Sequence, residues 1–187
     1  YDLKLGQHAV NFLVGTSYEH YKSERLYSKR TDFVSDGLED IEQGNNISKD
    51  LPDGRGIVES KMLSYFGRIN YSYKDRYLFE ANLRADASSR FHKDNRWGWF
   101  PSFSAGWRIS EESFMKPIAW LNNLKLRASY GTLGNINNVG YYDYFELLSS
   151  NANYNFNDEP VKGVLEAQIT NKTLGWETVA LSDFGLD

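Results

Sequence analysis

Hydrophobic and polar residues alternate strictly along the middle of the chain, over residues 62–87. In residues 63–73 and again in residues 77–87, every second position is apolar, aromatic or small, and the positions between them are mostly polar. Successive side chains leave opposite sides of a strand, so this period of two predicts two strands. The short polar segment Lys74-Asp75-Arg76 between them predicts an antiparallel hairpin.

The two faces of this hairpin differ in chemistry. One face is apolar, with tyrosines grouped at the turn end, and the other carries guanidinium, carboxylate and amide groups. A strand that separates lipid from a wet interior shows this pattern. The hairpin therefore predicts an all-β fold, namely the antiparallel wall of a transmembrane β-barrel.

Four further segments alternate in the same way, at residues 8–21, 97–110, 124–132 and 176–187. With the hairpin they make about six long strands, fewer than a large barrel needs, and the last still runs at Asp187. Pro101 lies inside the fourth strand and cannot donate to a ladder, so we expect a bulge there or full pairing only from Ser102. Ser110 is expected to cap a helical turn over residues 111–123, with Glu111 and Glu112 in its first turn.

The connections between these strands differ in length. We expect long loops at residues 22–61, where the charged run from Lys22 to Asp32 ends the first strand, and at 133–175. A helical turn is expected around Asp36–Ile41 in the first loop and a strand extension around Tyr141–Leu148 in the second. Barrels have short periplasmic turns and longer extracellular loops, which assigns 74–76 and 110–123 to the periplasmic side.

Aromatic residues gather near the two ends of the expected strands, as bilayer interfaces select. The inner group is Tyr71, Tyr73, Tyr77 and Trp107, and the outer group is Tyr18, Trp97, Trp99, Tyr130 and Trp176. Core aromatics of a soluble sandwich are the alternative, and would lie nearer the strand middles.

Composition narrows the class of protein. No segment approaches the roughly 20 apolar residues of a membrane helix, and the mean hydropathy of −0.59 is compatible with barrel strands. A net charge of −4 argues against nucleic acid as a partner. The chain has no cysteine, which excludes disulfides and thiol chemistry within it. No signal peptide opens the sequence, so if the protein is exported, we expect that Tyr1 is not its true start and that the sequence is either mature or excised from a longer one.

Several segments, in order along the chain, resemble the barrel of SusC/RagA-type TonB-linked outer-membrane transporters. They are SYFGRINY (64–71), KDRYL (74–78), SSRF (88–91), RWGWFPS (96–102), SAGWRISEE (104–112), WLNNLKLRASYG (120–131), NKTLGWE (171–177) and FGLD (184–187). The resemblance covers essentially the whole chain and is dense from Leu63 to Asn135.

This resemblance implies a 22-stranded barrel of the Gram-negative outer membrane, filled by an N-terminal plug. It implies import of glycans, oligosaccharides or peptides, a SusD-like lipoprotein at the extracellular face, and energy from the TonB complex through an N-terminal region. Residues 1–187 would be part of the barrel domain alone, without plug, TonB box or remaining strands. The long loops would meet substrate or the lipoprotein. A passive porin-like channel and a soluble β-rich carbohydrate-binding or adhesion module remain alternatives.

The sequence names no substrate-binding residue and predicts no catalytic residue, cofactor or metal, so we do not expect an enzyme. The charged residues expected to face the lumen belong either to a substrate path or plug contact, or to a structural mesh of ion pairs; they are Arg68, Glu80, Arg84, Asp86, Arg108 and Arg127. His8, His20 and His92 share no metal-ligand spacing. The sequons at Asn46 and Asn171 are expected to be coincidental.

Aromatic side chains in the second long loop would either stack on sugar rings or a lid protein, or pack within the loop. They are Tyr141, Tyr142, Tyr144, Phe145, Tyr154 and Phe156.

Overall fold

The computed structural model describes the chain except residues 34, 36, 38–39, 42–43, 45, 48–53, 119 and 157–158. It divides into two compact units, one made of Tyr1–Glu19 with Lys61–Asp187 and the other of His20–Ser60. Two strands, β2 (His8–Tyr27) and β5 (Gly54–Tyr73), belong partly to each unit.

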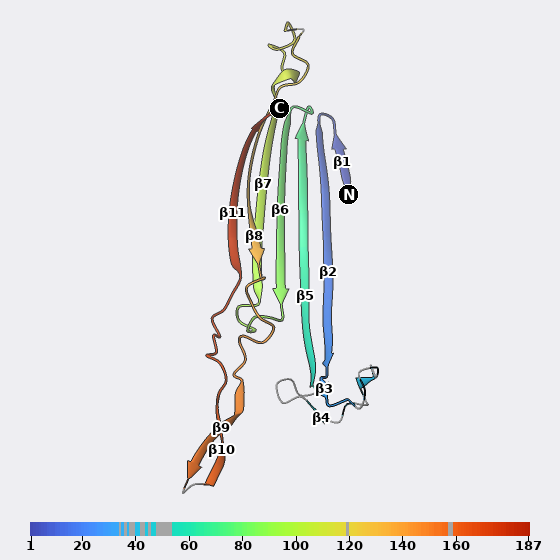
Figure 1. Cartoon of the computed structure of the whole chain (residues 1–187). Helices are drawn as coiled ribbons and strands as arrows, with labels where there is room; N and C mark the ends of the chain where they lie inside the picture. Colours follow the sequence, from blue (N-terminus) through green and yellow to red (C-terminus); the bar gives the residue numbers. More distant parts are fainter. Residues whose placement is uncertain are drawn as a thin grey trace. The chain divides into compact units, whose positions relative to one another are not determined.

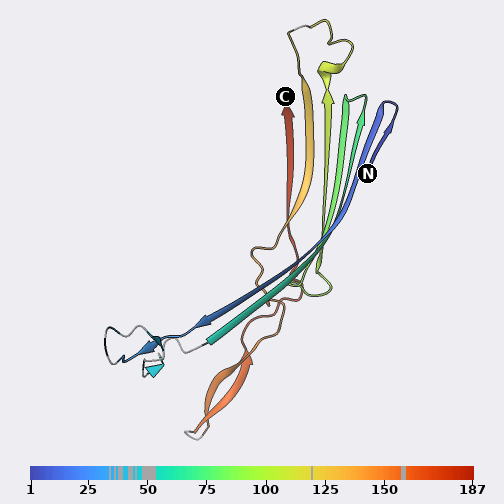
Figure 2. The ribbon, with the colours of Figure 1, turned by 90° about the vertical axis from the view of Figure 1, so that its right-hand side faces the viewer.

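The first unit is built on one seven-stranded sheet with the order β1-β2-β5-β6-β7-β8-β11 (Figure 1). Its other strands are β1 (Asp2–Leu5), β6 (Tyr77–Ser88), β7 (Trp97–Arg108), β8 (Lys125–Asn135) and β11 (Glu177–Leu186). The six long strands are the six expected, and the short β1 was not predicted. Figure 2 shows the strands of this unit in a single layer. The edges are β1 and β11, which do not pair with each other, so this sheet is not closed.

The predicted hairpin is present, with Leu63 opposite Ala87 and Tyr73 opposite Tyr77. Lys74 and Asp75 both have φ of 54°, and the Arg76 N–H donates to the Tyr73 carbonyl at 3.0 Å. Two successive residues with positive φ give a turn whose twist suits the flanking strands. The turn is therefore built on two residues that are strained in this conformation.

Pro101 continues the strand without a register shift, opposite Leu83 of β6. On its other side, pairing of β7 with β8 begins at Ser102, opposite Gly131. This confirms the expectation that the strand is fully paired only from Ser102. The Thr132 hydroxyl donates to the Pro101 carbonyl at 3.2 Å. This carbonyl therefore has a hydrogen-bond partner on β8 although Pro101 itself precedes the first β7–β8 residue pair.

The first long loop is shorter than expected, because β2 runs on to Tyr27 and β5 begins at Gly54. In the second unit, one ion pair lies within the β2 extension and one contact joins β2 to β5. Lys22 pairs with Glu24 at 2.6 Å and His20 with Glu59 at 2.8 Å. The charged run therefore marks exposed strand and not the end of the strand.

Two short strands, β3 (Arg30–Thr31) and β4 (Asn46–Ile47), pair antiparallel between β2 and β5 in the chain. The helical turn expected around Asp36–Ile41 falls largely outside the described residues.

The connections of the first unit differ from prediction in two places. The only helical segment described at residues 109–123 is the 3₁₀ turn η2 (Ile109–Glu111), whose cap residue is Arg108 and which has no side-chain cap. The expected strand extension at residues 141–148 is mostly turn. Instead, β9 (Leu148–Phe156) and β10 (Glu159–Glu166) form a separate antiparallel hairpin.

One face of the sheet, which we call the apolar face, is exposed. Ile69, Phe79, Leu83 and Phe103 keep 43–47% of their surface accessible. The buried apolar residues described are few, namely Ala85, Ala87, Phe91, Phe100 and Val139. Within the described residues, no second layer covers the apolar face. None of the helical segments described has the length and hydropathy of a membrane span.

Candidate functional site on the polar face of the sheet

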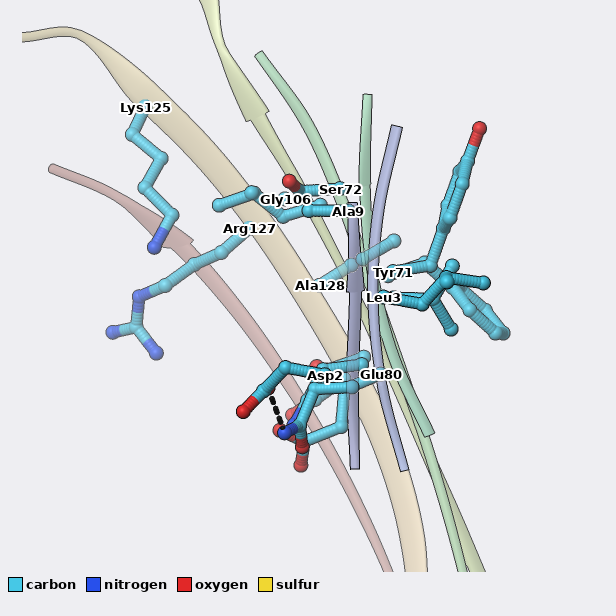
Figure 3. Close-up of a pocket in the computed structure, with 18 of the residues that line it drawn as sticks. Asp2, Leu3, Ala9, Tyr71, Ser72, Glu80, Gly106, Lys125, Arg127 and Ala128 are labelled. Atoms are coloured by element: carbon cyan, nitrogen blue, oxygen red, sulfur yellow. Dashed lines mark hydrogen bonds between the residues drawn. The ribbon is translucent and has the colours of Figure 1, made fainter. Parts of the chain in front are cut away.

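The strand register brings the predicted charged residues to the opposite face, which we call the polar face. Arg68 lies opposite Asn82, Glu80 opposite Asn70 and Ser104, and Arg127 opposite Gly106. The remaining predicted members share this face; they are Arg84, Asp86 and Arg108. In Figure 3, Lys125 and Arg127 extend to one side of the strands and Tyr71 to the other.

Two neighbouring concavities hollow the polar face. The first has a volume of about 870 Å³ and is lined in part by Asp2, Asn70, Glu80, Lys125 and Arg127 (Figure 3). The second, of about 680 Å³, is lined in part by Arg68, Asn82 and Arg84. Both present charged and amide groups from at least three strands, so the face provides a polar lining.

Several of the charged side chains on this face pair with one another. Arg84 donates from Nε to both oxygens of Asp86 at 2.8 Å and from Nη2 to the Ser64 hydroxyl at 3.0 Å. Asp86 is 7% exposed and Ser64 is 1% exposed. A carboxylate this buried needs such a partner, because burying it alone would be costly.

Two more arginines are held in the same way. Arg68 donates to Asn82 Oδ1 at 2.7 Å and lies 4.0 Å from Glu80, while Arg127 contacts Asp183 at 2.8 Å. These contacts are those expected of a structural mesh of ion pairs. A role of the same residues in a substrate path or plug contact stays a prediction.

Glu112 is the residue of this region whose role the sequence did not indicate. Its carboxylate accepts hydrogen bonds from the Tyr77 hydroxyl at 2.8 Å, Trp107 Nε1 at 3.2 Å and Arg76 Nη1 at 3.1 Å. These bonds hold the pKa of Glu112 below its usual value, and the bond from Tyr77 makes the largest contribution. The expectation that a helix N-terminus explains Glu112 is wrong, because the residue follows η2 and accepts from side chains of other segments.

A row of aromatic rings crosses three strands beside Glu112. Tyr73, Tyr77 and Trp107 are stacked, with ring centroids 6.3 Å and 6.4 Å apart. This confirms that the inner aromatic group gathers at the turn end of the hairpin.

The outer group is confirmed only in part. Trp97 stacks on Tyr65 at 6.0 Å, and Trp99 is 63% exposed on the apolar face. Tyr130, however, lies opposite Phe103, which is between Trp97 and Trp107 along β7 and not at its outer end.

Trp176 is not part of an exposed belt either. Its ring packs against Phe91 at 5.2 Å and Phe100 at 5.3 Å, and its Nε1 donates to the Arg96 carbonyl at 2.9 Å. Phe91 is fully buried and Phe100 is 7% exposed. The sequence did not reveal this cluster, because Trp176 is distant along the chain from Phe91 and Phe100.

The other residues considered from the sequence lie apart. His8 accepts from or donates to the Tyr71 hydroxyl at 2.9 Å, and His92 lies 3.2 Å from Asp94. Asn171 Oδ1 accepts locally from the Thr173 N–H and hydroxyl. The first sequon includes Ser48, which lies outside the described residues.

The loop aromatics pack partly on one another. Tyr144 and Phe145 have ring centroids 4.3 Å apart, and Arg90 lies over the Tyr141 ring at 4.1 Å. Tyr154 is 66% exposed, and the side chain of Phe156 is outside the described part.

An open antiparallel sheet with an exposed apolar face and a charged, hollowed opposite face is the wall of a β-barrel. The family model for the TonB dependent receptor-like beta-barrel matches residues 1–187, and the chain belongs to this family.

Relatives and solved structures agree with this assignment. The chain is 35% identical to TonB-dependent receptor SusC of Bacteroides thetaiotaomicron, over an alignment that covers 100% of this chain and 18% of the relative. It is 34% identical to TonB-dependent receptor P39 of Formosa agariphila, covering 97% of this chain and 17% of that protein. The RagAB peptide importer in its 'open-open' state matches with a TM-score of 0.84 and 30% identity, over 100% of this chain and 20% of that one. The chain thus spans about a fifth or less of these proteins.

Proposed function

We propose that this chain forms one section of the barrel wall of a TonB-dependent importer in the bacterial outer membrane. The transporter takes up nutrients that are too large for passive pores, either oligosaccharides or peptides. The section itself performs no covalent chemistry. It supplies a lipid-facing surface, a polar lining and anchor points for the loops at its ends.

The exposed apolar face is the observation that carries the proposal. A soluble domain of this size buries such residues beneath a second layer, whereas Ile69, Phe79 and Leu83 remain 43–47% accessible. Hydrocarbon is the environment that suits this surface. On the other face, the paired arginines suit a water-filled or plugged interior.

Two partners follow from the proposal. A SusD-type lipoprotein would close the extracellular mouth, and the TonB complex would supply energy through a segment outside this chain. Membership in the TonB-dependent receptor family, together with the similarity to SusC and RagAB, supports both partners.

The test is uptake by cells that carry the intact protein. Growth on a panel of single oligosaccharides and peptides is compared among wild-type cells, cells lacking the gene and cells depleted of TonB. We expect loss of growth on one substrate class in both altered strains, with the protein in the outer-membrane fraction. Growth that persists without TonB would indicate a passive channel, and a protein found in the soluble fraction would contradict the barrel.

A further inference from the structure

A concavity of about 470 Å³ lies beyond the ends of β6 and β7, away from the Lys74–Arg76 turn. Three segments meet there, namely the connection between β6 and β7, the turn near residue 145, and the segment that leads into β11. Its lining residues are His92, Lys93, Arg96, Tyr144, Phe145, Glu146 and Lys172. Asn95 Nδ2 donates to the Lys172 carbonyl at 3.0 Å and ties two of the segments together.

The lining carries an excess of positive charge. Lys93, Arg96 and Lys172 contribute three cations against the carboxylate of Glu146, and the nearby Asp94 carboxylate lies 3.2 Å from His92 Nδ1. Within the described part of the chain, the charged groups of these three residues have no ion-pair partner. Arg96 Nε is buried and has no hydrogen-bond partner there, although its backbone is fixed by the bond from Trp176 to its carbonyl. A buried guanidinium nitrogen without a partner is costly, and a lining with this excess of positive charge favours an anion.

Aromatic rings form one wall of the same concavity. Tyr144 and Phe145 lie 4.3 Å apart, His92 meets the Tyr144 ring edge to face at 6.1 Å, and Phe145 is 47% exposed. An exposed ring beside cations offers an apolar surface for the C–H face of a sugar and donors for its acidic groups.

We propose that this concavity binds an anionic saccharide, one whose sugar rings carry carboxylate or sulfate groups. The inference rests on the proposed import function, and it narrows the substrate to acidic glycans. An extended peptide fits less well, because the lining segments are turns and irregular backbone, which present no strand edge for β-pairing. The unpaired cations would also draw the anion toward the site from solution.

The experiment measures binding to the intact purified protein by calorimetry, independently of uptake. The probes are a uronic acid tetrasaccharide, a sulfated tetrasaccharide, a neutral tetrasaccharide of the same linkage and hexaglutamate. We expect at least one acidic saccharide to bind roughly tenfold or more tightly than the neutral one, with affinity that falls as salt rises. Comparing the two acidic probes shows whether the site prefers carboxylate or sulfate groups.

Two exposed lysines provide the variants, since removing them leaves Arg96 in place. Lys93→Gln and Lys172→Gln should each weaken binding of the acidic saccharide by roughly three- to tenfold, and Phe145→Ala should weaken it as well. Lys116→Gln, an exposed lysine outside the concavity, serves as the matched control and should bind as the wild type does.

Equal binding of the neutral and acidic saccharides would overturn the inference, as would tighter binding of hexaglutamate. Wild-type affinity in the Lys93→Gln/Lys172→Gln double variant would do the same. Because binding is read without transport, these outcomes leave the proposed import function to its own TonB-dependence test.

Discussion

At the scale of single residues, Glu112 fixes the connection after β7 to the strands beside it. Three donors from Arg76, Tyr77 and Trp107 converge on its carboxylate, and all three bonds favour the ionised form. A carboxylate whose pKa is lowered by folding adds stability above its unfolded pKa. That contribution disappears as the pH falls through the folded pKa.

Glu112→Gln should therefore lower the stability of the intact protein at neutral pH and have little effect in acid. The measurement is the denaturant midpoint in lipid vesicles, from pH 7 down to about pH 3. The difference in denaturant midpoint between wild type and variant should be constant above about pH 4.3, the usual glutamate pKa, and should shrink toward zero at lower pH. The neighbouring, exposed Glu111→Gln is the control and should leave the midpoint unchanged. A gap that does not vary with pH would contradict the role assigned to the charge.

Gly98 is the residue that lets Phe100 and Trp176 pack closely. A Cβ at this position would lie 2.5 Å from Phe100 Cζ and 2.9 Å from Trp176 Cδ1. Both atoms belong to rings of the Phe91–Phe100–Trp176 cluster and have little room to move.

Gly98→Ala should cost about 1–3 kcal/mol, the usual cost of overpacking, and make residues 88–96 more sensitive to protease. Gly175→Ala is the control, because the nearest atom to its added Cβ is the Thr173 carbonyl oxygen at 4.0 Å. Limited proteolysis with mass spectrometry reads the result. Equal protection of both variants would show that the cluster is not tightly packed.

At the scale of elements, the Lys74-Asp75 turn sets the register of the central hairpin. Both residues have positive φ, which residues with a Cβ adopt at a cost. The Lys74 N–H donates to the Gln7 carbonyl at 2.8 Å, so the turn is also held by the neighbouring connection between β1 and β2.

Lys74→Val should lower stability by roughly 1–2 kcal/mol, and Lys74→Gly should raise it by about 1 kcal/mol. Both variants remove the contact of the Lys74 ammonium with the Tyr73 ring and keep the N–H, so neither of these accounts for the difference between them. That difference combines the strain of a left-handed valine with the larger entropy of an unfolded chain that contains glycine. Denaturant unfolding in vesicles measures it. Identical midpoints would mean that the left-handed conformation is not kept in the folded protein.

The elements that the sequence predicted best are those whose two faces meet different surroundings. Residues 62–87 alternate because one face is apolar and the other polar, and the structure has the same pairing. Strand segments elsewhere in the chain do not have two faces in such different surroundings, so their sequences need not alternate. In β2 beyond residue 21 the exposed side chains include Lys22, Glu24 and Arg25, and in β9 they include Asn155, so the pattern resembles a loop.

Parts of the candidate site could not be predicted from the sequence for a similar reason. Glu112 and Trp176 derive their roles from partners on other strands, and neither alternation nor spacing along the chain signals such contacts. The six charged residues predicted for the polar face could be found because each of them lies on a strand that alternates in the sequence, whereas Asp2 lies on the unpredicted β1.

At the scale of the whole molecule, the sheet of the first unit separates two environments. Phe103 and Ser104 are adjacent in β7, yet Phe103 lies opposite Ala81 on the apolar face and Ser104 opposite Glu80 on the polar face. The proposed function depends on these two side chains meeting lipid and a polar interior, respectively.

Quenching by brominated lipid tests this separation most directly. Phe103→Cys and Ser104→Cys are made one at a time in the intact protein without other cysteines, labelled with a fluorophore and placed in vesicles. This chain contributes no thiol of its own. We expect strong quenching of the label at residue 103 and little at residue 104. Equal quenching at both positions, or none at residue 103, would contradict it.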